Sequence, residues 1–189
     1  MIAVIGNGSL PAGDPRAQLA FEVGKALVDN GYRLVSGGLG GVMGHASAGA
    51  AASSEHREGD VVALLPGFDP SAAAPQADIV IATGLDHARN FIVANSDAVV
   101  AIGGGAGTLS EMAGAWQLDR LIIALRCEGW SGKLADERVD GRARYVDVPD
   151  DRVRGADDAG EVVALLQRWL STYRLRHVGI PAQRPDDGK

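Results

Sequence analysis

The sequence predicts an α/β fold, a Rossmann-like, doubly wound parallel sheet in a single domain. Short apolar runs alternate with segments of helical periodicity, which is the pattern of strands and crossover helices in parallel sheets. Glycine-rich loops follow three of these runs, and 189 residues is an ordinary length for one domain. Because ligands bind beyond the carboxyl ends of parallel strands, the three loops are expected to lie together at one edge of the sheet.

The first elements follow from short-range patterns. Residues 2–5 are an apolar run that ends in glycine, as a strand buried on both faces does. A helix is predicted over residues 14–30, where apolar side chains recur every three or four positions and a glycine follows. Residues 32–35, 41–54 and 60–65 are then predicted to be a strand, an alanine-rich helix and a strand that a Pro-Gly pair closes.

The alternation continues through the middle of the chain. Residues 68–76 contain two prolines and are expected to form a loop, a candidate lid over a ligand. Strands are predicted at residues 79–82 and 98–102, and helices at residues 86–95 and 108–118.

The last third of the chain is less patterned. Residues 121–124 form another predicted strand, residues 129–151 are polar and weakly periodic, and an amphipathic helix is predicted over residues 162–170. The domain is expected to span residues 1–173, and residues 174–189 are expected to be a mobile tail.

Composition and charge argue against several partners. The formal net charge is −6 and only 5% of the residues are aromatic, which disfavours nucleic acid. No run of 18 apolar residues is present, so no membrane partner is expected. Cys127 is the single cysteine, and the histidines His45 and His87 stand without other metal ligands. We therefore expect no disulfide and no metal, and a cytoplasmic location.

The strongest local motif is GGGAGTLSE at residues 103–111, between a predicted strand and a predicted helix. Glycines let backbone N–H groups approach an anion, and the start of the next helix adds unpaired donors and the positive end of its dipole. Residues 36–44 and 6–9 hold the same position after their own strands. Together the three loops predict a phosphate-binding edge.

Two common nucleotide motifs are absent. The dinucleotide fingerprint G-x-G-x-x-G fails because Pro11 stands where its third glycine belongs, and the second strand ends in Ser36 and Gly37 instead of an acidic residue. The chain also lacks G-x-x-x-x-G-K-[ST], the phosphate loop of nucleoside triphosphatases. The expected ligand therefore carries one phosphate.

Four motifs, taken in order, resemble the Lonely Guy (LOG) superfamily, whose members were long mislabelled lysine decarboxylases. They are GGLGGVMG at residues 37–44, LPG at 65–67, ARN at 88–90 and GGGAGTLSE at 103–111. The similarity covers roughly residues 1–125. It is strongest to a short branch that includes proteins similar to the molybdenum cofactor carrier.

The resemblance implies an activity and its residues. Hydrolytic members remove the base from a nucleoside 5′-monophosphate, using an arginine and the glutamate that ends their glycine motif. By match, these catalytic roles fall on Arg89 and Glu111. The phosphate or nucleotide would be bound by Gly8, Ser9, Gly38, Gly40, Gly41, Met43, Gly104, Gly105, Gly107 and Thr108. The resemblance implies no required cofactor and a homo-oligomer, either a dimer or a dimer of dimers.

Two departures leave the function open. Gly103 stands where the hydrolases have proline, and Ala88-Arg89-Asn90 replaces their Glu-Arg-Lys, and both changes resemble the carrier branch. One hypothesis is a phosphoribohydrolase of a purine or modified purine nucleoside monophosphate. The alternative is a non-catalytic carrier of molybdenum cofactor, whose pterin ends in a phosphate. DNA binding, as in related DNA-processing proteins, is disfavoured by charge.

Purely structural interpretations compete with these roles. Thr108 and Glu111 match a capping box, and a glutamate near a helix start is expected to stay ionised. Arg89 alone would be interpreted as a solvated surface residue. Trp116 and Leu118 are predicted to lie in the core or in a dimer interface. A solvated acidic surface is predicted for Asp136, Glu137, Asp150, Asp151, Asp157 and Asp158.

Overall fold

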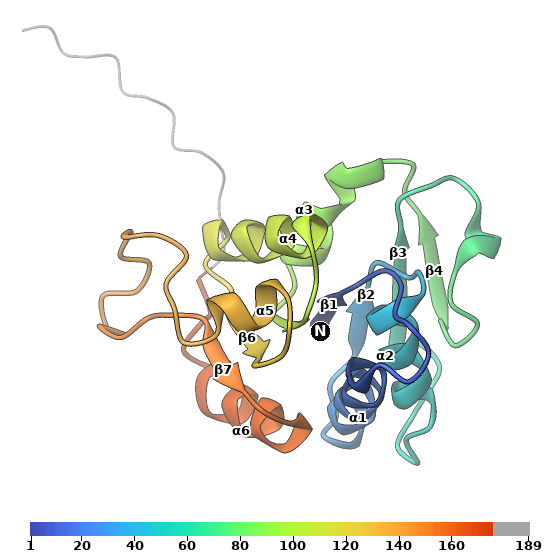
Figure 1. Ribbon diagram of the computed structural model, residues 1–189, viewed down its shortest axis with the longest axis horizontal. Helices are drawn as coiled ribbons and strands as arrows, with labels where there is room; N and C mark the ends of the chain where they lie inside the picture. The colour runs from blue at the N-terminus through green and yellow to red at the C-terminus, as the bar shows by residue number, and fades with distance from the viewer. Residues whose placement is uncertain (176–189) are drawn as a thin grey trace, which may run out of the picture.

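The computed structural model describes residues 1–175, which form a seven-stranded, all-parallel sheet in the order β4-β3-β2-β1-β5-β6-β7 (Figure 1). The strands are β1 (Ile2–Gly6), β2 (Leu34–Ser36), β3 (Val61–Leu65), β4 (Ile79–Ala82), β5 (Ala98–Ile102), β6 (Leu121–Leu125) and β7 (Arg154–Ala156). The strand order reverses at β1, which lies between β2 and β5. This reversal is the switch point at which such sheets bind ligands.

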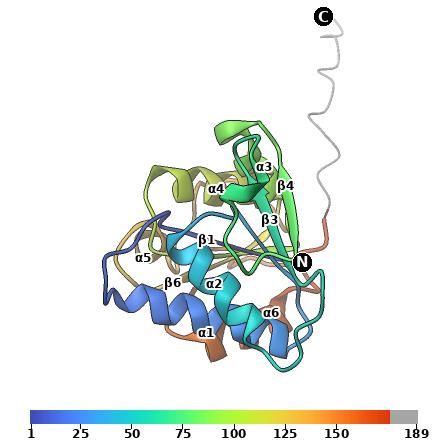
Figure 2. The ribbon, with the colours of Figure 1, turned by 90° about the vertical axis from the view of Figure 1, so that its right-hand side faces the viewer.

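Helices cover both faces of the sheet. They are α1 (Pro15–Asp29), α2 (Gly41–Ala51), α3 (Asn90–Ala94), α4 (Ala106–Gln117), α5 (Trp130–Leu134) and α6 (Ala159–Trp169), with short 3₁₀ turns η1 (Pro70–Ala72) and η2 (Asp86–Arg89). One layer holds α1, α2 and α6, and the other holds α3, α4 and α5 (Figure 2). The predicted doubly wound fold is therefore confirmed.

The central strands are buried on both faces, as their continuous apolar runs predict. Residues 2–5 of β1 have no exposed surface, and they pair in register with residues 98–101 of β5. The edge strand β4 is different, because Ile79 and Ile81 are 45% and 47% exposed. None of the helices within residues 1–175 is long and apolar enough to cross a lipid bilayer.

Helix α1 shows why the predicted bounds of the first helix were close. The side chain of Asp14 accepts a hydrogen bond from the amide of Arg16, and Pro15 occupies the first helical position. The helix ends before Gly31, whose φ of +77° is in the left-handed region. α1 is thus capped by its own side chains, unlike the two helices that begin beside the switch point.

Several predicted bounds need correction. The helix predicted over residues 86–95 is divided into η2 and α3, and the helix predicted from residue 108 begins two residues earlier as α4. The polar stretch at residues 129–151 contains α5, and β7 follows it at the sheet edge. α5 has five residues and β7 has three, too few for a periodic pattern to show.

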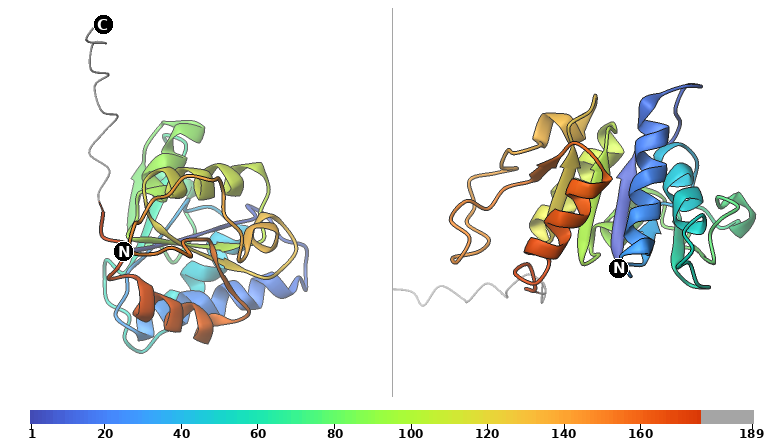
Figure 3. Two further views of the ribbon diagram at one scale, coloured as in Figure 1. Left: turned by 90° about the vertical axis from the view of Figure 1, so that its left-hand side faces the viewer. Right: turned by 90° about the horizontal axis from the view of Figure 1, so that it is seen from below.

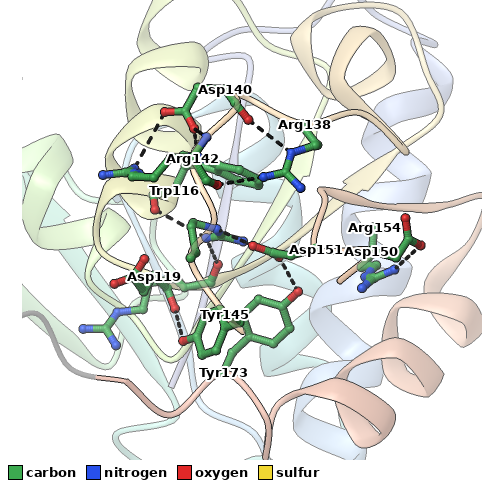
Figure 4. Close-up of polar contacts among 12 residues, drawn as sticks. Trp116, Asp119, Arg138, Asp140, Arg142, Tyr145, Asp150, Asp151, Arg154 and Tyr173 are labelled. Carbon is green, nitrogen blue, oxygen red and sulfur yellow. Dashed lines mark hydrogen bonds and ion pairs between the residues drawn. The ribbon is translucent and has the colours of Figure 1, made fainter. Parts of the chain in front are cut away.

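Residues 135–153 form a long connection that extends beyond the β7 side of the sheet (Figure 3). Its anchor is Arg144, whose buried guanidinium donates to both carboxylate oxygens of Asp151 at 2.8 and 2.7 Å. The same guanidinium donates to the carbonyl of Arg120 at 3.0 Å and lies 3.7 Å from the centre of the Trp116 ring. Tyr173 donates to Asp151 at 2.6 Å (Figure 4).

The prediction that Asp151 is a solvated surface residue is therefore wrong, since it is 2% exposed and neutralises Arg144. Losing one partner of a buried ion pair leaves an unpaired charge, which costs about 3–5 kcal/mol. Burial and the Asp151 contact raise the pKa of Tyr173 to about 12. Tyr173 is 1% exposed, so the folded part of the chain includes this residue. The predicted mobile tail lies, from residue 176 onward, outside the described residues.

Candidate functional site

The three glycine loops meet beside β1, as the strand order predicts. The carbonyl of Asn7, in the loop after β1, accepts a hydrogen bond from the amide of Val42 at 2.9 Å, at the start of α2. The side-chain oxygen of Asn7 accepts from the amide of Gly104 at 2.7 Å, in the loop after β5. One residue thus joins all three loops at the switch point.

The turn before α4 is held by its first two amides. The amide of Gly103 donates to Ser131 Oγ at 2.7 Å, and the amide of Gly104 donates to Asn7. Both glycines have positive φ, +65° and +91°, and the Thr108 side chain packs where a Gly104 side chain would lie. The turn is therefore a fixed structure with no room for larger residues.

The next amides are unpaired. α4 begins after Gly105, which provides no side-chain cap, and residues 105–107 are exposed. Within the described part of the chain, the amides of residues 105–108 donate to no protein acceptor. Adjacent unpaired N–H groups at a helix start form a site for an anion.

Five of the glycines predicted to bind phosphate fall into two groups. Gly8, Gly105 and Gly107 have nothing within 4 Å of the position of a side chain, so the surface beside them is open. Gly38 and Gly41 have positive φ and lie against Ala63 and Asn7 respectively, so packing demands glycine there.

The other residues predicted to bind the ligand differ in whether they border the open surface or belong to the packing. Ser9 is exposed in the loop after β1, and Gly40 precedes the first residue of α2. The side chain of Met43 is buried in α2, and that of Thr108 is buried in α4. Ser9, Gly40 and Thr108 thus border the switch point, whereas the Met43 side chain belongs to the packing of α2.

Arg89 and Glu111 form a buried ion pair beside these loops. Arg89 Nη1 donates to Glu111 Oε1 at 3.1 Å, and each residue is 7% exposed. The guanidinium lies against Gly37, where an added Cβ would come within 2.4 Å of Nη2. Arg89 Nε is buried without an acceptor among the described residues. Arg89 therefore retains a buried donor beyond the one that Glu111 uses.

This geometry decides against two competing structural interpretations and corrects one expectation. Arg89 is not a solvated surface residue. Thr108 and Glu111 do not form a capping box, because the helix starts at Ala106 and the Glu111 carboxylate turns toward Arg89. Glu111 was expected to stay fully ionised, but burial raises its pKa to about 7 even though Arg89 lowers it. Near neutral pH both protonation states of Glu111 are populated.

A second polar link joins α3 to the start of α4. Asn90 Nδ2 donates to Ser110 Oγ at 2.9 Å, and Ser110 Oγ donates to the carbonyl of Gly107 at 2.8 Å. Asn90 therefore fixes the first turn of α4 with a neutral side chain.

Sequence reasoning missed Asn7 and Ser131, the two side chains that hold the turn. Asn7 lies inside the Gly-Asn-Gly motif, so the sequence does carry a signal for it. The prediction of the anion site rests on the glycines of that motif alone and therefore passes over Asn7. Ser131 offered no signal, because it is 28 residues from Gly103 in a stretch without clear periodicity. Among residues 1–175, no three His, Cys, Asp or Glu side chains are grouped as metal ligands.

Comparison with known proteins places this geometry in a family. The model of the SLOG cluster4 family matches residues 1–152. A cytokinin riboside 5′-monophosphate phosphoribohydrolase of Mycobacterium tuberculosis is 38% identical over 104 residues, which are 52% of this chain and 53% of that protein.

Two solved structures share most of the fold. The molybdenum cofactor binding protein of Rippkaea orientalis has a TM-score of 0.71 at 29% identity, covering 88% of this chain and 94% of that chain. The molybdenum cofactor carrier protein of Chlamydomonas reinhardtii has a TM-score of 0.71 at 27% identity, covering 90% of this chain and 98% of that chain. The chain belongs to the SLOG cluster4 family and is a LOG-like protein that resembles molybdenum cofactor carriers.

Proposed function

We propose that the edge formed by the three glycine loops binds the phosphate of a purine or modified purine nucleoside 5′-monophosphate, and that the protein hydrolyses its N-glycosidic bond. The observation that carries the proposal is that Glu111, which pairs with Arg89, lies on α4, the helix whose start presents four unpaired amides. The amides supply the anion site, and the pair supplies an ionisable carboxylate beside it.

The reaction needs a group that favours positive charge at the sugar. When the bond between C1′ and the base nitrogen breaks, C1′ develops oxocarbenium character, which a carboxylate stabilises. The oxygen of water bonds to C1′, one of its protons goes to the departing base nitrogen, and the products are ribose 5-phosphate and free base. Ionised Glu111 is assigned to stabilising C1′ or activating the water, and Arg89 to orienting Glu111 and the ligand.

A carrier of molybdenum cofactor is the second candidate. Two structures of such binding or carrier proteins cover about nine tenths of this chain. The phosphate of the pterin would accept hydrogen bonds from the same amides at residues 105–108, and Arg89 would face the polar ring of the pterin. In this function no bond is broken, and Glu111 serves only to hold Arg89.

One experiment separates the two candidates. The purified protein is incubated with a panel of nucleoside monophosphates, and free base is measured by chromatography. Hydrolysis predicts base release that Glu111→Gln lowers about 100-fold or more, because general acid–base and charge effects are of this size. Glu58→Gln, at an exposed glutamate, is the matched control and is expected to leave release unchanged.

One result would contradict hydrolysis, and another would contradict the role of Glu111. If no monophosphate is cleaved while oxidised pterin fluorescence co-purifies with the protein, the carrier function replaces the enzyme. Equal release by wild type and Glu111→Gln would remove Glu111 from the mechanism.

A homo-oligomer is also proposed, on an observation of the surface. Apolar side chains are exposed on and beside the edge strand β4 and helix α3. They are Phe68, Ile79, Ile81, Leu85, Phe91 and Ile92, each at least 45% exposed. Clustered exposed apolar side chains are typical of an interface.

A further inference from the structure

We propose that Asn7 is the positioning residue of the anion site: its side-chain carbonyl holds the turn that presents the amides of α4, and its side-chain NH₂ group faces the ligand's phosphate. The inference rests on the proposed function, because it concerns the same site. It assigns a role to a residue that the glycine motifs do not include.

The hydrogen bonds fix which way the Asn7 amide points. Its side-chain oxygen accepts hydrogen bonds from the amide of Gly104 at 2.7 Å and from Arg16 Nη1 at 3.3 Å. Both partners are donors only, so the atom that they meet must be the carbonyl oxygen. The NH₂ group consequently points away from them, and among the described residues it has no acceptor. It is a neutral donor left at the switch point.

Arg16 is already neutralised. Its Nε and Nη2 donate to Asp14 at 2.9 and 2.5 Å, and Nη1 also donates to the carbonyl of Glu128 at 3.2 Å. The contact with Arg16 lowers the pKa of Asp14 to about 2, so this pair stays ionised. Arg16 therefore serves to orient Asn7, and it does not act as a free cation for the ligand.

Gly103 explains why the turn depends on Asn7. Proline fixes φ near −65° and has no N–H, whereas Gly103 has φ of +65° and donates its amide to Ser131. A side chain at residue 103 would also come within 2.6 Å of Asn7 Oδ1. Because residue 103 is glycine, the backbone alone does not fix this turn. Asn7 and Ser131 hold it from either side.

The amides of residues 103 and 104 are thus used by the protein, and those of residues 105–108 remain for an anion. Removing the Asn7 carbonyl would free the Gly104 amide and let the turn change direction. Replacing the NH₂ group with a carboxylate oxygen would leave an acceptor for the turn but exchange a donor for a negative charge at the anion site.

The test uses the whole protein with Asn7→Ala and Asn7→Asp, and with inorganic phosphate and ribose 5-phosphate as probes in titration calorimetry. Hydrogen exchange of the Gly104 amide is followed by NMR in parallel. Asn7→Ala is expected to speed this exchange about tenfold or more and to weaken both probes about tenfold or more, as the loss of a hydrogen bond to a charged group does. Asn7→Asp is expected to keep the exchange of the Gly104 amide slow, because an acceptor remains. It is nevertheless expected to lower the affinity for both probes.

Asn95 provides the matched control. The side-chain oxygen of Asn95 also accepts a hydrogen bond from an arginine, Arg120. Asn95 lies between α3 and β5, at the amino ends of the strands and away from the glycine loops. Asn95→Asp is expected to bind both probes as wild type does.

The outcomes separate the two proposals. Wild-type protein that binds neither probe would contradict the proposed function, whatever the variants do. Wild-type binding with unchanged affinity in Asn7→Asp, or unchanged Gly104 exchange in Asn7→Ala, would overturn the role of Asn7 alone.

Discussion

At the scale of single residues, burial decides the ionisation of Glu111. Its place near the start of α4 would favour the charged form, and so would Arg89 at 3.1 Å. Enclosure by the protein has the larger effect and raises its pKa to about 7. A sequence shows the helix and the arginine motif, but it does not show how much water reaches a side chain. This is why full ionisation was the wrong expectation.

The pKa of Glu111 predicts a change of stability with pH. A carboxyl group whose pKa rises from 4.5 to about 7 on folding binds more protons in the folded state between these values. Wild type is therefore expected to lose up to about 3 kcal/mol relative to Glu111→Gln as pH rises from about 5 to 8. Urea unfolding of both proteins at the two pH values measures this difference.

The matched control is Glu58→Gln, at an exposed glutamate outside the site, whose unfolding is compared with that of wild type at the same two pH values. A difference between wild type and Glu111→Gln that is the same at pH 5 and pH 8 would show that Glu111 titrates normally.

The site residues differ in how far they could be predicted. Arg89 and Glu111 were identified through motifs, and their contact follows from the adjacent positions of α3 and α4. Asn7 was overlooked because its partner Gly104 is 97 residues away. Asp151 was assigned to the surface because the connection that holds it and Arg144, seven residues apart, has no periodic pattern that predicts their pairing.

At the scale of elements, length separates what could be predicted from what could not. Buried strands such as β1 and β5 consist of continuous apolar runs, four residues before Gly6 in β1 and five in β5, so their positions are predicted almost to the residue. β7 has three residues and contains arginine and glycine, so it resembles loop sequence. Its strand conformation comes from pairing with β6, which sequence periodicity does not record.

The contact of Gly37, in the loop between β2 and α2, with Arg89 leads to a testable prediction. In Gly37→Ala the new methyl group would meet the end of the Arg89 side chain, at 2.4 Å from Nη2. Because a side-chain end can move, we expect the protein to stay folded with Arg89 displaced from Glu111. The affinity for ribose 5-phosphate should fall about tenfold, as expected when a charge-assisted hydrogen bond is lost.

Titration calorimetry of this variant is compared with Gly141→Ala, where nothing lies within 4 Å of the added methyl. If Gly37→Ala binds as tightly as Gly141→Ala, Arg89 does not take part in binding.

At the scale of the whole molecule, the exposed apolar side chains of α3 and β4 predict self-association. Ile92 is 46% exposed on α3, and a charge there should oppose burial against a second copy. We expect wild type to sediment as a dimer or a larger homo-oligomer and Ile92→Glu to shift toward the monomer. Val146→Glu, at a residue that is 94% exposed, should sediment as wild type. A monomeric wild type would contradict the proposed assembly.

The contact between Arg144, Asp151 and Tyr173 has a consequence for how the chain is made. Arg144 meets carbonyls near the carboxyl end of α4, the helix that presents the anion site, and Tyr173 completes the same cluster. During synthesis, Tyr173 leaves the ribosome long after the glycine loops have emerged. Until Tyr173 has left the ribosome, Asp151 therefore lacks one of the two side chains that donate to it, so this cluster beside α4 is completed last.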